Sequence, residues 1–236
     1  PYIAALQAQK VPIFDRAEVL GELLKTFKCV IAVAGTHGKS TTSALIYEIL
    51  RQAGKNVSCH IGAEVEFAKF NPGDDFVVVE ACEFNKSFLH IYSNISVVTN
   101  VEPEHMDCYG SLKNLQNAFA TFAKRAKLRY AFATKTTEFL KKYKNMHFVK
   151  EGAFKSKLKG EYNQKNISLA VAVCRDLGVD DATILKAVES FAGLPRRYEF
   201  IGNYMSTKIY IDYAHHPTEL DAFITTFKQE YPNSLI

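Results

Sequence analysis

A short apolar run that breaks into a glycine-bounded turn is the feature that most constrains this chain. Residues 30–34 are Val-Ile-Ala-Val-Ala, and Gly35-Thr-His-Gly-Lys-Ser40 follows without a gap. The run predicts a buried strand, and the hydroxyl residues that begin at Ser40 open a predicted helix that ends before Gly54. Free N–H groups and the positive end of the helix dipole then face the turn, which favours a bound anion. Lys39 could reach terminal phosphates, and Ser40 could ligate magnesium.

The turn is a shortened variant of the usual phosphate-binding pattern. That pattern has a glycine five residues before the Gly-Lys pair, and Val33 stands at this position here. The motif alone therefore leaves two interpretations open. One is a nucleotide site, and the other is an ordinary strand-to-helix turn with a lysine at the surface.

The rest of the chain alternates apolar runs with amphipathic segments, which predicts a layered α/β domain with a mostly parallel sheet flanked by helices. Predicted strands lie at 30–34, 75–80, 95–101, 130–133 and 147–149, and predicted helices at 16–26, 40–53, 111–127, 163–177 and 181–191. The pattern then changes to short strands at 198–201 and 208–212 and a last helix at 217–229. Because Gly193 and Pro195 punctuate the change, we expect a second α/β domain to begin near residue 198.

Charge and cysteine usage exclude several classes of protein. The net charge is +4, but 29 basic and 25 acidic residues are interspersed, so we expect no nucleic-acid groove. The five cysteines form no Cys-x-x-Cys pair, which is typical of reduced thiols and predicts no zinc site. No signal peptide or apolar stretch of membrane-spanning length is visible, so we expect a soluble cytoplasmic protein without membrane insertion.

Two predicted strands end in residues that could hold a metal ion. Glu80 closes a run of valines, and Glu102-Pro-Glu-His-Met-Asp107 follows the next strand. In an open parallel sheet, both ends lie at the edge where ligands bind. Glu80 is either a magnesium ligand or a solvated strand-end carboxylate, and His105 is either a ligand or a hydrogen-bonded structural residue.

Five motifs in order resemble the Mur ligase family of ATP-dependent amide-bond-forming enzymes. They are 34–40 (Ala-Gly-Thr-His-Gly-Lys-Ser), 102–107, 161–166 (Glu-Tyr-Asn-Gln-Lys-Asn), 194–198 (Leu-Pro-Arg-Arg-Tyr) and 212–219 (Asp-Tyr-Ala-His-His-Pro-Thr-Glu). The second motif and His37, where most branches have asparagine, resemble the alanine-adding branch. The resemblance covers nearly the whole chain. It implies the tail of a UDP-substrate domain at 1–28, the central ATP-binding domain at 29–197 and the start of the ligase domain at 198–236.

The resemblance also implies a role for individual residues. ATP would be bound by Gly35, Thr36, His37, Gly38, Lys39, Ser40, Thr41, Asn163, Asn166, Arg197 and Asp212. Magnesium would be held by Ser40 and Glu80, with His105 helping to bind a second metal ion. The residues expected to take part in catalysis are Lys39, Glu80, His105, Arg197, His215 and His216. Either histidine of the pair could orient substrate or accept a proton, and the alternative for both is helix capping near Pro217.

The chain departs from the family pattern in two places. Residues 81–87, Ala-Cys-Glu-Phe-Asn-Lys-Ser, replace a more acidic segment, which puts substrate contacts by positions 82, 84 and 85 in doubt. Some relatives carry a carbamylated lysine that bridges two metal ions, but this chain has Phe119-Ala120 in that region, so we expect no such modification.

The chemistry that the resemblance implies is a step of peptidoglycan precursor synthesis. The lactyl carboxylate of UDP-N-acetylmuramate would be activated as an acyl phosphate, and the amine of L-alanine would then displace phosphate. We expect this chain to bind ATP without efficient ligation, since most of the two flanking domains is missing. Two alternatives remain: a recycling ligase that attaches a ready-made peptide to the same sugar nucleotide, and a nucleotide-binding module without ligase activity.

Overall fold

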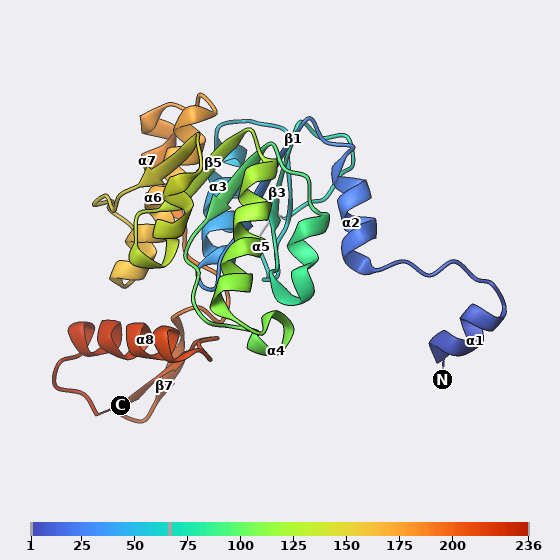
Figure 1. The fold of residues 1–236 in the computed structure, drawn as a ribbon. Coiled ribbons are helices and arrows are strands. Elements are labelled where there is room, and N and C mark those ends of the chain that lie inside the picture. The colour runs from blue at the N-terminus through green and yellow to red at the C-terminus, as the bar shows by residue number, and fades with distance from the viewer. Residues whose placement is uncertain (1, 66–67, 236) are drawn as a thin grey trace.

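The computed structural model, which describes residues 2–65 and 68–235, is built around a six-stranded parallel sheet of order β2-β3-β1-β4-β5-β6 (Figure 1). The strands are β1 (Cys29–Ala34), β2 (Val57–His60), β3 (Phe76–Glu80), β4 (Ile95–Val98), β5 (Leu128–Phe132) and β6 (Met146–Val149). The predicted fold class, a mostly parallel sheet flanked by helices, is confirmed. Because β1 lies between β3 and β4, the carboxyl ends of these three strands meet beside the phosphate loop.

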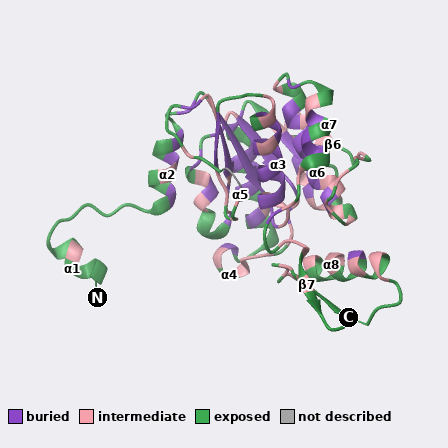
Figure 2. Ribbon diagram, turned by 180° about the vertical axis from the view of Figure 1, so that it is seen from behind, coloured by how far each residue is buried: buried purple, intermediate pink, exposed green. Residues whose placement is uncertain are grey.

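Helices cover both faces of the sheet, and each face has its own hydrophobic core. One core includes α3 (Lys39–Gln52), α6 (Glu161–Asp176) and α7 (Asp181–Ser190). The other includes α2 (Arg16–Leu24), the 3-10 segment η1 (Phe84–His90) and α5 (Leu112–Arg125). Strand β1 serves both cores, since Ile31 and Val33 belong to the first and Val30, Ala32 and Ala34 to the second. Figure 2 shows this buried interior in the sheet and α3.

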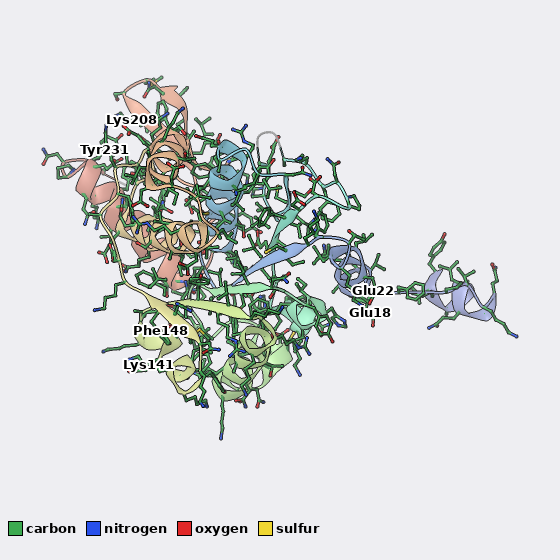
Figure 3. The ribbon with its side chains drawn as sticks, turned by 90° about the horizontal axis from the view of Figure 1, so that it is seen from above. Glu18, Glu22, Lys141, Phe148, Lys208 and Tyr231 are labelled. Atoms are coloured by element: carbon green, nitrogen blue, oxygen red, sulfur yellow. The ribbon has the colours of Figure 1, made fainter. Side chains whose placement is uncertain are left out.

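A smaller unit follows the sheet domain. It consists of the antiparallel pair β7 (Glu199–Tyr204) and β8 (Thr207–Ile211) and of α8 (Pro217–Glu230), and we call it the C-terminal unit (Figure 1). Rings of Tyr198, Tyr210, Phe223, Phe227 and Tyr231 pack together in it. The ammonium of Lys208 lies 4.2 Å from the ring centroid of Tyr231 (Figure 3). Aromatic packing therefore joins α8 to the hairpin.

The N-terminal segment extends away from the sheet. Helix α1 (Tyr2–Ala8) has no buried residue and is separated from α2 by an extended stretch (Figure 1). Helix α2 begins at a capping box, in which Asp15 accepts from the Ala17 amide and Glu18 accepts from the Asp15 amide. In the described part of the chain, no helix is long and apolar enough to cross a membrane.

Most elements lie within a few residues of their predicted ranges, but the strand predicted at 95–101 is wrong at its end. Strand β4 stops at Val98, because Thr99 and Asn100 bond to the phosphate loop and the Val101 amide donates to Thr136. Strand β2 and helix α1 were not predicted, and neither were the short helical segments η1, α4 (Met106–Tyr109) and η2 (Lys135–Lys142). Most of these are too short for hydrophobic periodicity to reveal.

Candidate nucleotide site

The phosphate loop connects β1 to α3, and glycine is required at both of its ends. Gly38 is the N-cap of α3 and has a left-handed backbone, with φ of 80°. A Cβ atom at Gly38 would lie 2.3 Å from Oδ1 of Asn166, and one at Gly35 would lie 1.8 Å from Oγ1 of Thr99. The backbone at Gly35 and Gly38 thus packs so closely against Thr99 and Asn166 that no side chain would fit at either glycine.

The segment after β4 holds the loop in place. The side chain of Asn100 accepts from the His37 amide at 2.9 Å and donates to the His37 carbonyl at 3.0 Å. Thr99 also donates to that carbonyl, and the hydroxyl of Thr36 accepts from the Glu102 amide at 2.9 Å. Sequence reasoning did not assign Thr99 or Asn100, although their position at a strand end beside the loop was a usable signal.

Lys39 is held from two sides inside the loop. Its ammonium donates to the Thr36 carbonyl at 3.1 Å and to Oε1 of Glu83 at 3.0 Å. Glu83 is 1% exposed, and burial raises the pKa of its carboxyl although Lys39 acts in the opposite direction. Glu83 was not predicted as a site residue. Its place in the motif after β3 was the only sequence signal for it.

The proposed metal ligands lie in two places. Glu80, at the end of β3, accepts from the Gly62 amide at 2.9 Å. His105 instead clusters with Glu83 and Glu104, and ligand atoms of these three residues lie within 4.8 Å of one another. Ser40 is buried at the start of α3.

A divalent cation fits the chemistry of this edge. Within residues 2–65 and 68–235, Oε2 of Glu83 and Oε2 of Glu104 are buried without a hydrogen-bond partner. Carboxylate oxygens are the ligands that hard cations prefer, so these two atoms suit such an ion. Ser40, Glu80 and His105 remain the ligands proposed on sequence.

A cavity of about 220 Å³ lies beside the loop and is lined by residues of both the sheet domain and the C-terminal unit. It brings together predicted site residues from four of the five motifs and from α3: His37, Gly38, Thr41, Asn163, Asn166, Arg197 and Asp212. Apolar walls come from Phe132, Leu158, Leu169 and Leu194. An apolar pocket with a few polar groups beside a phosphate loop suits a nucleoside.

Two asparagines of α6, Asn163 and Asn166, line the cavity beside the phosphate loop. Asn166 donates to Oδ1 of Asn163 at 3.2 Å and accepts from the Thr42 hydroxyl at 3.4 Å. Both asparagines are buried, and Asn163 also donates to the Lys159 carbonyl at 2.7 Å. Neighbouring Tyr162 is partly buried, and the loss of solvent around it raises the pKa of its hydroxyl to about 12.

The C-terminal unit supplies the remaining predicted residues. Asp212 accepts from the Tyr198 and Ala214 amides, both at 2.7 Å, so its carboxylate shapes the chain at this point. His216 is the N-cap of α8, and its Nδ1 accepts from the Thr218 amide. His215 is largely exposed, and its Nε2 lies 3.8 Å from Oε1 of Glu104. The capping role is thus observed for His216.

His37 lies between two carboxylates that sequence reasoning did not assign. Its Nε2 is 3.4 Å from Glu102 and its Nδ1 is 3.2 Å from Glu219. Neither contact has hydrogen-bond geometry, so the attraction is mainly between charges. Burial disfavours the charged ring, but the carboxylates outweigh it and raise the pKa of His37. For Glu219, burial is outweighed by His37, the His215 amide and Arg197, which lower the pKa of its carboxyl to about 2.

Comparison with known proteins agrees with this geometry. Residues 33–147 match the Mur ligase middle domain. The UDP-N-acetylmuramate–L-alanine ligase of Caldicellulosiruptor bescii is 31% identical, with 97% of this chain and 59% of that protein covered. The enzyme of the same name from Myxococcus xanthus is 29% identical, with 100% of this chain and 58% of that protein covered. This chain therefore spans somewhat more than half the length of either relative.

Solved structures show the same fold. The crystal structure of the UDP-N-acetylmuramate-alanine ligase of Thermotoga maritima has a TM-score of 0.85 and 26% identity, covering 99% of this chain and 62% of that one. A murein peptide ligase of Psychrobacter arcticus shares the fold with a TM-score of 0.75 and 21% identity, covering 98% of this chain and 61% of that one. The chain belongs to the Mur ligase family, and residues 33–147 correspond to the middle domain of that family.

Proposed function

We propose that this chain carries the nucleotide site of an ATP-dependent ligase that joins L-alanine to UDP-N-acetylmuramate in peptidoglycan precursor synthesis. The observation that carries the proposal is the cavity, which is lined by the phosphate loop and by Arg197 and Asp212, two residues at the junction with the C-terminal unit. The names of the two curated relatives, similar along nearly the whole chain, support the choice of substrates. The proposal includes domain boundaries between residues 28 and 29 and between residues 197 and 198.

In this proposal, the charges around the loop neutralise the phosphates of ATP. Lys39 would exchange Glu83 for the β- and γ-phosphates, and Arg197 would contact the γ-phosphate from the other side of the cavity. Asn163 and Asn166 would face the nucleoside, and Asp212 would add a contact. A magnesium ion held by Ser40 and Glu80, with His105 at a second one, would supply further positive charge.

The proposed reaction has two steps. The lactyl carboxylate oxygen of UDP-N-acetylmuramate bonds to the γ-phosphorus while the bond to the bridging oxygen of ADP breaks, which gives an acyl phosphate. The amine of L-alanine then attacks the acyl carbon, loses a proton, and displaces inorganic phosphate. No protein nucleophile takes part, so the residues act by alignment and by charge stabilisation. We propose His215 or His216 as the group that orients the amine or accepts its proton.

Calorimetry of the chain with ATP and magnesium tests the nucleotide site. Lys39→Ala is expected to weaken binding by at least about tenfold, because the cation beside the phosphates is lost. Lys113→Ala on the exposed side of α5 is the matched control and is expected to bind as the parent chain does. Equal affinity in all three proteins would show that the loop is not the nucleotide site.

Phosphate release separates the remaining alternatives. The proposal expects release that requires both UDP-N-acetylmuramate and L-alanine, assayed in the chain joined to its flanking domains. Release that needs a ready-made peptide in place of alanine would identify a recycling ligase. ATP binding without amine-dependent release in that longer protein would instead identify a nucleotide-binding module.

A further inference from the structure

The contact between the phosphate loop and α8 is unusual in its composition. His37, in the loop, lies 3.2 Å from the carboxylate of Glu219, in the first turn of α8. The two side chains are only 13% and 15% exposed. Residues more than 180 positions apart in the chain thus place a basic ring and a carboxylate together where water is largely excluded, and the reduced screening strengthens their attraction.

Neighbouring groups reinforce this contact. Thr218 donates to Oε2 of Glu102 at 2.7 Å, and Glu102 is the second carboxylate beside His37. The ring of His216 lies 4.6 Å from the ring of His37. Glu102 thus accepts a hydrogen bond from α8 and lies beside the imidazole of His37. The first turn of α8 therefore has two contacts here: Thr218 with Glu102, in the segment after β4, and Glu219 with His37, in the loop.

The contact between His37 and Glu219 also holds α8 where it forms one wall of the cavity. Thr218, Glu219, Ala222 and Phe223 of α8 line the cavity. Arg197 also lines it, and its guanidinium lies 3.8 Å from Glu219. Movement of α8 away from the loop would remove this wall and release Arg197 from its carboxylate partner.

The connection between the two units has a defined but strained backbone. Arg196 and Tyr198 have left-handed φ values of 60° and 52°. Their amides donate to Glu199 and to Asp212, both at 2.7 Å. Non-glycine residues in this region persist only where surrounding contacts hold them, and here Glu199 and Asp212, at the start and just after the end of the hairpin, hold the link.

We propose that Glu219 is a positioning residue for the phosphate loop: through His37 it docks α8 on the loop and holds Arg197 over the nucleotide cavity. This inference goes beyond the proposed function and does not depend on it, because it concerns the chain without nucleotide or substrate. It also gives the histidine of the loop a role that the phosphate chemistry leaves open.

Hydrogen exchange of the ligand-free chain tests the pair through a double-mutant cycle of His37→Asn and Glu219→Gln. Each single change is expected to raise amide exchange in residues 218–223 and 35–38 by roughly five- to tenfold at pH 6. The double variant is expected to exchange no faster than either single variant. The loop keeps its anchor in His37→Asn, because Asn100 bonds only the backbone of that residue. Glu161→Gln, an exposed carboxylate on α6, is the matched control.

The pH dependence of exchange distinguishes a specific His37–Glu219 contact from a general contribution of either residue to stability. The groups that face His37 are Glu102, Glu219 and His216, and those beside Glu219 are Arg197 and His215. Protection of the amides of residues 218–223, corrected for intrinsic exchange, is expected to fall as pH rises and His37 loses its charge. This pH dependence should disappear in both variants. Additive effects in the double variant, or a profile unchanged by either substitution, would overturn the proposal. Unaltered exchange in β1 serves as the folding check for every variant.

Discussion

The ammonium of Lys39 lies 3.0 Å from the carboxylate of Glu83, a side chain that is almost completely buried beneath the phosphate loop. The second carboxylate oxygen of Glu83 has no hydrogen-bond partner among the residues that the structure describes. A lysine proposed to bind phosphate is thus neutralised by an internal carboxylate. Breaking such a pair leaves a buried charge without compensation, which makes the site sensitive to changes at either residue.

Glu83→Gln is expected to change how stability depends on pH. Burial raises the pKa of Glu83 above the ordinary value of a glutamate, 4.5. A carboxyl whose folded pKa is raised stabilises the fold below its unfolded pKa, and this stability is lost as pH rises through the folded value. Glu83→Gln removes this pH-dependent loss of stability. The free energy of unfolding of the variant, relative to that of the parent chain, should therefore rise by on the order of 1 kcal/mol between pH 5 and pH 8. Urea denaturation measures this, and parallel pH profiles of the two proteins would contradict it.

Glu219→Gln is expected to cost stability in a limited pH window. The pKa of Glu219 is lowered from 4.5 to about 2, so its stabilisation is present above 4.5 and lost as pH falls through about 2. The pKa of His37 is raised from 6.5, so its contribution is present below 6.5 and lost as pH rises through the folded value. The variant should therefore lose most near pH 5–6, about 1–3 kcal/mol, and less at pH 9. Urea denaturation should find Glu161→Gln close to the parent chain throughout, and an equal loss at both pH values would refute the argument.

Gly38→Ala and Gly54→Ala separate backbone strain from steric clash. Both glycines have positive φ, 80° and 70°, but a Cβ atom meets Asn166 at 2.3 Å only at Gly38, and nothing within 4 Å at Gly54. Gly54→Ala should cost about 1–2 kcal/mol in the free energy of unfolding and leave nucleotide binding intact. Gly38→Ala should cost about 3 kcal/mol or more and abolish nucleotide binding. Equal losses in thermal unfolding would mean that the loop can move to accept a side chain.

Asn100→Ala tests the anchor of the phosphate loop. The side chain makes two hydrogen bonds to the backbone of His37, each worth about 0.5–1.5 kcal/mol. Without them, we expect nucleotide affinity to fall by roughly tenfold in calorimetry, because the loop must be ordered at the moment of binding. The matched control is Asn117→Ala on the exposed side of α5. Unchanged affinity in Asn100→Ala would show that other contacts suffice to order the loop.

The order of elements in the sheet domain could be predicted because its signals are local. The buried runs at β1 and β3 and the amphipathic pattern of α5 follow from the pleat and the helical repeat, and the turn before α3 follows from its glycines. The end of β4 could not be predicted in this way. Val101 continues the apolar run beyond Thr99 and Asn100, so the pattern extends the strand, whereas in the structure the side chains of Thr99 and Asn100 bond to the phosphate loop.

The sequence by itself determined the phosphate loop, the strand-end acids and the likeness to the Mur ligases, since each depends on residues close together in the chain. Only the tertiary structure decided the distant partners: Glu83 beside both Lys39 and His105, and Glu102 with Glu219 around His37. These pairs join strand ends and a helix that lie far apart in the sequence. Their charges interact through space, over distances that no spacing along the chain encodes.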